Sequence, residues 1–183
     1  MKLKFNKINI NNLEQIRFWR MLPEVTKYMY SDPVLSPEGQ LKWYNLKVLN
    51  NPNEKYWLIN VDAKNIGLVN FYNIDNVNQR AYWAYYIAEN GYQGKGIGKL
   101  VELNMLKYCF EVLNFNKLCC EVFCFNDMVI KLHEKFGSKV EGTLRKHIRK
   151  NDDYFDIVSM GILKEEWQLI KNNFDFEIIE IEE

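Results

Sequence analysis

The stretch Gln93-Gly94-Lys95-Gly96-Ile97-Gly98-Lys99 carries the clearest structural signal in this sequence. It stands between a strand-like run at residues 80–87 and a run with helical apolar spacing at residues 100–113. Glycines allow several backbone N–H groups to converge, and the amino end of a helix favours an anion. The stretch therefore predicts a phosphate-binding loop between a strand and a helix, with positive charge from Lys95 or Lys99.

Two common phosphate loops do not fit this spacing. A Walker loop needs G-x-x-x-x-G-K-[ST], and the outer glycines here are one residue too close together. A dinucleotide-binding G-x-G-x-x-G needs a third glycine where Lys99 or Val101 stands. The pattern present is Q-x-x-G-x-G, formed by Gln93, Gly96 and Gly98. The alternative is that these glycines only turn a strand into a helix.

The elements on either side of the loop alternate in a way that predicts one mixed sheet. Asn11, followed by Glu14, predicts the cap of a first helix, and Ser36 with Pro37 predicts the start of a second. The predicted strands are residues 2–8, 56–61, 66–74, 80–87, 117–123, 140–148 and 155–163, and two further helices are predicted at 100–113 and 127–136.

The predicted order is β-α-α-β-β-β-α-β-α-β-β. The fourth and fifth strands are each followed by a helix, so we expect them to lie parallel and to splay into a cleft. The fold class expected is α/β (α+β): a single mixed central sheet of about seven strands with helices on both faces. We expect one domain over residues 1–183, with an acidic tail at about 175–183 that is frayed or forms an edge segment.

Composition narrows the class of protein. Hydrophobic residues make up 48% of the chain, and 24 basic side chains balance 24 acidic ones, so neither nucleic acid nor an anionic membrane is an expected partner. Neither a signal peptide nor a membrane span is evident, which predicts a soluble, cytoplasmic protein. Cys109, Cys119, Cys120 and Cys124 contain no C-x-x-C pair, so we expect buried thiols and no metal site.

Several motifs beyond the glycine loop carry a family resemblance. Residues 126–137 (NDMVIKLHEKFG) are similar to an N-x-x-[A/S/V]-x-x-[L/F]-[Y/H]-x-K-x-G segment, and EGTLR, DYFD and EEW follow at 141–145, 153–156 and 165–167. Together with the loop they resemble the GNAT superfamily of N-acetyltransferases. The resemblance implies the GNAT fold and an enzyme that uses acetyl-CoA as its acetyl donor.

The same resemblance implies a set of cofactor-binding residues. The backbone of the fourth strand would hold the pantetheine arm, and the amides of residues 94–99 would hold the pyrophosphate. Asn126 would approach the thioester or pantetheine, and Lys135 the adenosine end. The implied residues are Tyr85, Tyr86, Ile87, Gln93, Gly94, Lys95, Gly96, Ile97, Gly98, Lys99, Asn126 and Lys135.

Acetyl transfer to an amine needs a neutral amine, a donor for the oxyanion and a proton for the departing thiolate. We expect oxyanion donors at the backbone of Tyr86 and Ile87. Many members of the family place a tyrosine acid where this chain has His133, so the candidate catalytic residues are His133, Tyr86 and Asn126. Tyr85 and Tyr92 are other proton donors, the base is Glu89 or a water chain, and a non-catalytic helix histidine is the alternative for position 133.

The acceptor is decided by the amino-terminal half. Residues 18–25, 27–32 and 39–44 resemble the branch that acetylates nucleotide-linked amino sugars, and imply UDP-4-amino-4,6-dideoxy-N-acetyl-β-L-altrosamine of pseudaminic acid biosynthesis. Arg20 suits a diphosphate. The other implied substrate-binding residues are Met29, Tyr30, Gln40, Tyr72 and Tyr82.

Other functions stay open at this point. The aromatic residues of the amino-terminal half could equally be core residues at helical spacing. One alternative function is acetylation of the amino terminus of a ribosomal or other protein. A non-catalytic acyl-CoA-binding module is another. The partner expected is a small nucleotide-sugar substrate, and a homodimer is the assembly considered.

Overall fold

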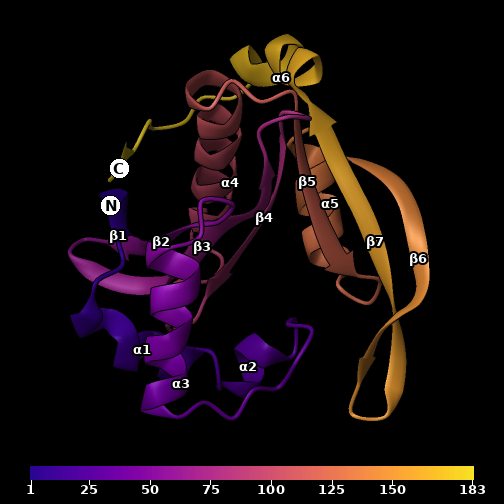
Figure 1. The fold of residues 1–183 in the computed structure, drawn as a ribbon. Coiled ribbons are helices and arrows are strands. Elements are labelled where there is room, and N and C mark those ends of the chain that lie inside the picture. Colours follow the sequence, from indigo (N-terminus) through magenta and orange to yellow (C-terminus); the bar gives the residue numbers. More distant parts are fainter. The chain divides into compact units, whose positions relative to one another are not determined.

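The computed structural model describes residues 1–183 and contains one mixed sheet of eight strands (Figure 1). Neighbouring strands are hydrogen-bonded in the order β6-β7-β5-β4-β3-β2-β1-β8. The strands are β1 (Leu3–Lys7), β2 (Lys55–Val61), β3 (Lys64–Asp75), β4 (Arg80–Ile87), β5 (Lys117–Phe123), β6 (Lys139–Lys150), β7 (Asp153–Leu163) and β8 (Glu180–Ile181). The α-helices are α1 (Leu13–Trp19), α2 (Pro23–Thr26), α3 (Pro37–Trp43), α4 (Ile97–Lys107), α5 (Asp127–Lys135) and α6 (Lys164–Ile170).

Strands β4 and β5 run parallel, as the sequence predicted. Their pairing joins Arg80 to Lys117, Ala81 to Leu118 and Tyr82 to Cys119, at the first residues of both strands. A parallel pair needs a long crossover, and α4 provides it. The expected fold class is therefore confirmed, with eight strands in place of about seven.

The chain packs as two compact units. The first comprises residues 1–74, 83–95 and 179–183, and the second comprises residues 75–82 and 96–178. In the first unit β1 pairs antiparallel with β2, and β2 with β3. The β2–β3 turn places Asp62 and Ala63 at φ 49° and 67°, the left-handed geometry that suits a tight hairpin.

Helix α1 forms the core of the first unit with the sheet. Leu13, Ile16 and Trp19 are buried on one helical face and cluster with Leu58 and Leu68 from β2 and β3. These helix residues are three apart in sequence, which places them on one side of the helix. Burial of this apolar face is what fixes α1 against the strands, because a helix of seven residues has little stability of its own.

Two details of the first unit correct the predictions. The cap lies at Asn9, not Asn11: the Asn9 side chain accepts from Asn11 N at 2.9 Å, and Asn12 accepts from Asn9 N at 3.0 Å. This reciprocal pair starts one 3₁₀ turn that leads into α1. Helix α2 was not predicted, whereas Ser36 caps α3 as expected, accepting from Gly39 N at 3.1 Å.

In the second unit β7 lies between β5 and β6 and is antiparallel to both. Helix α4 ends in a wider π-helical turn at Tyr108–Val112. Helix α6 was not predicted; its seven residues begin where Leu163 N donates to Glu166 Oε2 at 2.8 Å. Of the two readings of the acidic tail, the edge segment is found, because β8 pairs parallel with β1 in the first unit.

Three further features concern membrane spans, cysteines and metal-binding groups. No helix has the length and apolar character needed to cross a membrane. Cys109, Cys119 and Cys120 are buried, Cys124 is partly exposed, and all four are free thiols. The structure holds no group of three or more His, Cys, Asp or Glu side chains suited to a metal ion.

Candidate active site

The glycine loop ends in a helix whose first amides face open space. Gly94 and Gly96 have φ of 75° and 77°, which is left-handed backbone that glycine adopts without strain. A methyl group built on either residue would meet no atom within 4 Å. Gly96 is the N-cap of α4 and supplies no side-chain cap, so the first N–H groups of the helix have no side-chain acceptor. This is the geometry of an anion cradle.

The two lysines of the loop are engaged differently. Lys95 Nζ lies 5.3 Å from the centre of the Tyr92 ring, which Lys64 also approaches at 5.6 Å. Lys99 Nζ instead donates to the backbone oxygen of Asp175 at 3.1 Å. Gln93 is exposed, and Ile97 is buried and anchors the first turn of α4. Lys95 therefore lies against the half-buried Tyr92 ring, whereas Lys99 is bonded to the backbone.

The end of β4 departs from regular pairing. The carbonyl of Ile66 accepts from both Ala88 N at 2.8 Å and Glu89 N at 3.1 Å, the two-against-one pattern of a bulge. Gly67 lies so close that a side-chain carbon there would be 2.0 Å from the carbonyl oxygen of Tyr86. Bulges re-aim the strand in which they occur, and this one adjoins Tyr85, Tyr86 and Ile87, the predicted pantetheine and oxyanion residues.

Arg20 is half-buried at the carboxyl end of α1 in the first unit. Its guanidinium donates to Gln40 Oε1 at 3.0 Å and stacks on the Trp43 ring at 4.9 Å. Burial lowers the pKa of Arg20, while Tyr86 and Tyr56 raise it to a smaller extent, and no carboxylate is among its charge partners. An always-charged guanidinium without an acid beside it is a site for an anion.

Two further polar atoms in the same surroundings have no partner. Gln40 is 1% exposed and its Nε2 makes no hydrogen bond, and the Tyr86 hydroxyl is buried without one. Burial raises the pKa of Tyr86, with a smaller opposing effect of Arg20, so the phenol stays protonated. Unpaired buried donors are costly, and a polar ligand would satisfy them. The structure thus brings Arg20, Gln40 and Tyr86 together.

His133 is the best-buried of the predicted catalytic residues. It lies on α5, is 4% exposed, and its Nδ1 is 2.8 Å from Glu102 Oε1 on α4. Burial alone would lower the pKa of His133, but hydrogen bonds and charge from Cys120 and Glu102 outweigh it and raise the pKa. The imidazole is therefore held in its protonated form near neutral pH, which suits a proton donor.

Asn126 and Lys135 stand at opposite ends of α5. Asn126 is the N-cap, and its carbonyl accepts from Val129 N and Ile130 N. Lys135 is the last residue of the helix and is exposed. Nine helical residues separate them by about 13 Å. They can therefore reach different parts of a long ligand but not the same atom.

The other predicted substrate residues are more dispersed. Met29 is half-buried against the core of the first unit, and Tyr30 is 40% exposed. Tyr72 is half-buried on β3. Tyr82 belongs to the second unit, where burial, Cys119 and Glu121 raise its pKa. Within the first unit, the polar contacts around Arg20 include none of Met29, Tyr30 and Tyr72.

Glu89, the carboxylate considered as a base, is already engaged. It accepts from Trp19 Nε1 at 2.9 Å and pairs with Lys64 at 2.7 Å. The hydrogen bonds from Lys64 and Trp19 lower the pKa of Glu89, so it is a weak proton acceptor. A water chain, the other candidate from the sequence, stays a prediction.

Sequence reasoning missed Glu102, which is fully buried at 0% exposure. A signal for it existed. Glu102 precedes Met105, Leu106 and Cys109 by three, four and seven residues, so it lies on the apolar face of α4. A charged residue on a buried face requires a partner, and the sequence alone does not name that partner.

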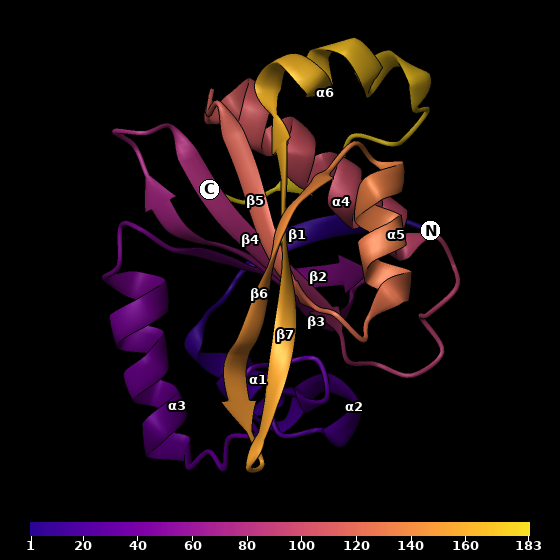
Figure 2. The same cartoon turned by 90° about the vertical axis from the view of Figure 1, so that its right-hand side faces the viewer.

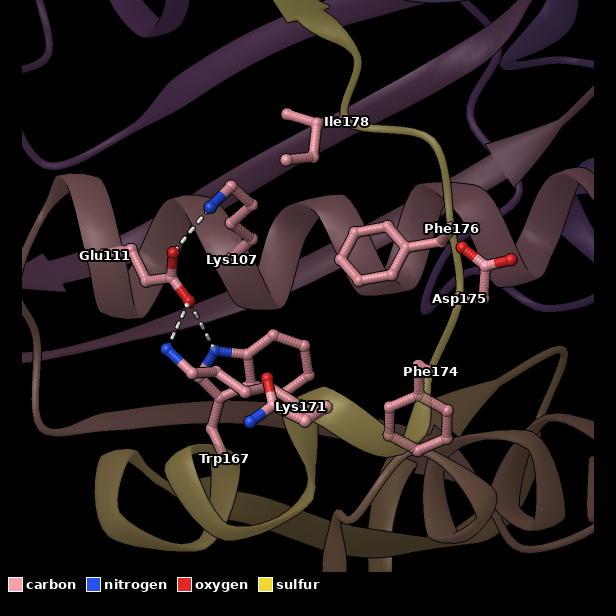
Figure 3. A pocket seen from close by; sticks show the side chains of 9 residues that line it. Lys107, Glu111, Trp167, Lys171, Phe174, Asp175, Phe176 and Ile178 are labelled. Atoms are coloured by element: carbon pink, nitrogen blue, oxygen red, sulfur yellow. Dashed lines mark hydrogen bonds and ion pairs between the residues drawn. The ribbon is translucent and has the colours of Figure 1, made fainter.

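A well-defined cavity of the second unit lies elsewhere. It has a volume of about 470 Å³ and is lined by the carboxyl end of α4, by α6 and by the segment that follows, all within the second unit (Figure 3). Glu111 accepts from Lys107 at 2.5 Å, Lys171 at 3.2 Å and Trp167 at 3.3 Å. These polar groups satisfy one another, and the cavity is at the opposite end of α4 from Gly96. It is therefore not the anion cradle.

Comparison with known proteins places this geometry in a family. The Acetyltransferase (GNAT) domain matches residues 2–139. Spermidine N(1)-acetyltransferase of Escherichia coli (strain K12) is 27% identical over 84% of this chain and 83% of its own length. Acetyltransferase PseH of Campylobacter jejuni (strain 81-176) is 29% identical over 74% of this chain and 82% of its own.

Two relatives from Bacillus subtilis are matched over less of their length. The chain spans 66% of an uncharacterised SPbeta prophage-derived N-acetyltransferase, at 34% identity, and 58% of a second relative, at 30% identity. The chain therefore covers less than two thirds of the length of each of these two relatives. Among solved structures, spermidine N-acetyltransferase from Vibrio cholerae in complex with CoA and spermine superposes with a TM-score of 0.84 at 24% identity, covering 91% of this chain and 98% of that one. At this identity the likeness shows the fold.

The chain belongs to the GNAT acetyltransferase family. The chemistry of this family is N-acetyl transfer with acetyl-CoA as the acetyl donor. The residues present fit that donor, because the cradle at Gly94 and Gly96 is open and its helix amides lack side-chain acceptors. A side chain at either glycine would fill the space a pyrophosphate needs.

Proposed function

We propose that this protein transfers the acetyl group of acetyl-CoA to the amino group of a small molecule that also carries phosphate. The acceptor we propose is UDP-4-amino-4,6-dideoxy-N-acetyl-β-L-altrosamine, acetylated at its 4-amino group for pseudaminic acid biosynthesis. The single observation that carries the proposal is the half-buried guanidinium of Arg20, which has no carboxylate partner. A diphosphate supplies the charge that this guanidinium lacks.

The neighbours of Arg20 support an anionic, hydrogen-bonding ligand. Gln40 Nε2 and the Tyr86 hydroxyl are buried donors without acceptors, and phosphate or sugar oxygens are acceptors. Trp43, stacked on the guanidinium, holds it in a fixed plane. A fixed, desolvated guanidinium gives both affinity and orientation to a phosphate group.

A polyamine acceptor fits this half of the chain less well. Between residues 14 and 42 four basic side chains, Arg17, Arg20, Lys27 and Lys42, are balanced by four acidic ones, Glu14, Glu24, Asp32 and Glu38. A polycation binds where carboxylates outnumber basic groups, because the potentials of the two partners must be complementary. This segment has no acidic surplus of the kind a polycation requires, and the guanidinium of Arg20 has no carboxylate among its charge partners.

The proposed roles of the chain's residues follow the needs of the reaction. Acetyl-CoA, when bound, supplies an acetyl group activated as a thioester. The amides of α4 and the glycine loop bind its pyrophosphate, and the bulged end of β4 directs backbone N–H groups to the oxyanion. Arg20 and Gln40 orient the acceptor, so that its amine is held next to the acetyl carbon. His133 donates a proton to the departing sulfur.

The test is a comparison of acceptors under one set of conditions. Release of CoA thiol would be followed with the UDP-linked amino sugar, spermidine, spermine and a ribosomal-protein amino-terminal peptide. The proposal predicts a kcat/KM for the sugar at least about 100-fold above that for each of the others, as expected when buried polar groups must be satisfied. Faster turnover of spermidine would overturn the acceptor while leaving acetyl transfer intact. No turnover with any amine would overturn the enzymatic role.

A further inference from the structure

The carboxylate of Glu89 joins separate segments of the first unit. Its Oε1 accepts from Trp19 Nε1 on α1 at 2.9 Å, and its Oε2 pairs with Lys64 Nζ at the start of β3 at 2.7 Å. The backbone N–H of Glu89 donates to Ile66 O at 3.1 Å, in the bulge that follows β4. Helix α1 lies below β3 in Figure 2, and the two elements share one core cluster. Glu89 therefore links α1 to the bulged end of β4.

Both ends of this link lie next to groups that the proposed reaction uses. On the helix side, Trp19 directly precedes Arg20, which is the C-cap of α1. On the strand side, Glu89 follows Tyr86 and Ile87, whose backbone N–H groups are the expected oxyanion donors. The link thus runs from the guanidinium proposed for the acceptor to the strand end proposed for the oxyanion.

The helix end of the link is buried. Trp19 is 1% exposed, and its indole N–H donates to Glu89 Oε1. A buried N–H without an acceptor is destabilising, so the indole ring is held at the carboxylate. Because Trp19 and Arg20 are neighbours at the end of α1, a shift of the indole also shifts the backbone that carries the guanidinium.

The ion pair with Lys64 is the weaker part of the link. The Lys64 side chain is 52% exposed and that of Glu89 is 26% exposed, and ion pairs in contact with water contribute little to stability. The hydrogen bonds from Lys64 and Trp19 lower the pKa of Glu89, so the carboxylate is a poor base for the acceptor amine. Both of its oxygens are engaged by the protein, which favours a role in orientation.

We propose that Glu89 is a positioning residue for acetyl transfer: through Trp19 it fixes the end of α1 that carries Arg20 against the oxyanion end of β4. This inference rests on the proposed function. Glu89 itself takes up no proton and contacts no substrate. Such a link matters for rate, because a misplacement of about 1 Å between reacting groups can cost about 100-fold.

Substitutions of Glu89 separate positioning from base catalysis. Glu89→Gln keeps an oxygen that accepts from the indole N–H but cannot act as a base, whereas Glu89→Ala removes the acceptor. With the amine that supports turnover, kcat should fall by about tenfold or more in Glu89→Ala and by less than about threefold in Glu89→Gln. KM for acetyl-CoA should change by less than about twofold in both. Equal losses in the two variants, or a wild-type kcat in Glu89→Ala, would overturn the inference.

Trp19→Phe tests the same link from the helix side. Phenylalanine keeps an aromatic ring in the core but has no N–H to donate. The inference predicts that kcat falls by about tenfold or more, and that adding Glu89→Ala to Trp19→Phe lowers it by less than about a further twofold, because both changes break one bond. Losses that multiply in the double variant would show that the two residues act independently.

Two matched controls concern neighbouring ion pairs. Glu14→Ala removes the pair with Arg17 on the surface of α1, and Lys64→Met removes the exposed partner of Glu89. Both variants should keep kcat within about threefold of the wild type, since the bond between Trp19 and Glu89 stays intact. A loss in Lys64→Met as large as that in Glu89→Ala would assign the effect to the ion pair and contradict the inference.

The link can also be read without turnover. The chain has five tryptophans, and Trp19→Phe assigns the indole ¹⁵N–¹H signal of Trp19 by its loss from the spectrum. This proton should exchange slowly with solvent in the wild type and in Glu89→Gln, and about tenfold or more faster in Glu89→Ala. Equal exchange in the three proteins would overturn the link. Calorimetric titration with CoA shows that each variant is folded, and if Glu89→Ala is not, kcat of Trp19→Phe decides.

The two proposals fail in different ways. A wild-type protein that acetylates no amine loses both. A wild type that acetylates spermidine and not the sugar loses the proposed acceptor, while a tenfold loss of kcat for spermidine in Glu89→Ala keeps the positioning role. An active wild type whose kcat is unchanged by Glu89→Ala keeps the proposed function and loses only the role of Glu89.

Discussion

Glu102 and His133 form a buried ion pair in which Oε1 and Nδ1 are 2.8 Å apart and neither side chain is more than 5% exposed. The pair joins α4 to α5 and is separated by 31 residues of sequence. Its members come from helices that follow the two parallel strands. This contact links α5 to α4 and, together with Cys120, raises the pKa of the histidine.

Removing one member of this pair should be costly. His133→Leu leaves the Glu102 carboxylate buried and unpaired, and the free energy of unfolding should fall by about 3–5 kcal/mol at pH 6. The double variant Glu102→Leu, His133→Leu removes both charges and should recover most of that loss. Urea unfolding of the three proteins measures this. A double variant as unstable as the single one would contradict the reading of an uncompensated charge.

The same pair predicts how stability depends on pH. Burial lowers the folded-state pKa of His133, but hydrogen bonds and charge from Cys120 and Glu102 have the larger effect. The pKa is therefore raised above its ordinary value of 6.5. The stabilisation is thus fully present below pH 6.5 and is lost as pH rises through the raised pKa. The stability difference between the wild type and the double leucine variant should shift against the wild type over that window. A constant difference would contradict the raised pKa.

Gly96 should be intolerant of a side chain for two reasons. Its φ of 77° disfavours alanine, and an added methyl group would project into the open space of the cradle. Gly96→Ala should lower stability by about 1 kcal/mol and raise the Kd for CoA by about tenfold or more. Calorimetric titration with CoA measures the affinity.

A matched control for that substitution is Gly39→Ala. Gly39 is inside α3, where a methyl group would lie 3.4 Å from Ser36 Oγ, an ordinary contact. This variant should gain about 0.5–1 kcal/mol of stability and bind CoA as the wild type does. Equal CoA affinity in the two alanine variants would argue against a pyrophosphate at Gly96.

Gly67 predicts a backbone effect on the candidate oxyanion site. A side-chain carbon at Gly67 would lie 2.0 Å from Tyr86 O, so Gly67→Ala must displace β4 at the bulge. We expect a loss of about 1–3 kcal/mol in unfolding free energy and a fall in kcat with little change in KM for acetyl-CoA. Thermal unfolding and initial rates measure both. A variant with wild-type kcat would remove the bulge from the catalytic site.

Arg20 and Arg17 offer a matched pair for the acceptor. Arg20 has no acidic partner, whereas Arg17 forms an ion pair with Glu14 on the surface of α1. Arg20→Met should raise KM for the UDP-linked sugar by about tenfold or more and leave KM for acetyl-CoA unchanged. Arg17→Met should change neither. If both variants behave alike, Arg20 does not bind the acceptor.

Much of the fold could be predicted because its signals are local. The 117–123 strand was predicted with its observed bounds, and the 80–87 strand likewise, since β-branched and aromatic residues bounded by turns specify strands. Helix α6 was not predicted because it has seven residues, of which only Trp167 is buried, and this gives too little apolar periodicity. The cap is Asn9 and not Asn11 because the Asn9 and Asn12 side chains accept from two different backbone N–H groups, a pairing that a run of asparagines does not reveal in sequence.

The sequence by itself determined the backbone features of this protein: left-handed glycines before a helix, parallel strands each followed by a helix, and apolar faces at helical spacing. These follow from the φ preferences of single residues and from the need to bury apolar side chains. The tertiary structure alone decided which polar groups are paired: Glu89 with Lys64 and Trp19, His133 with Glu102, and Arg20 with no acid at all. Hydrogen bonds and desolvation act over a few ångströms in space, between residues whose distance along the chain carries no such information.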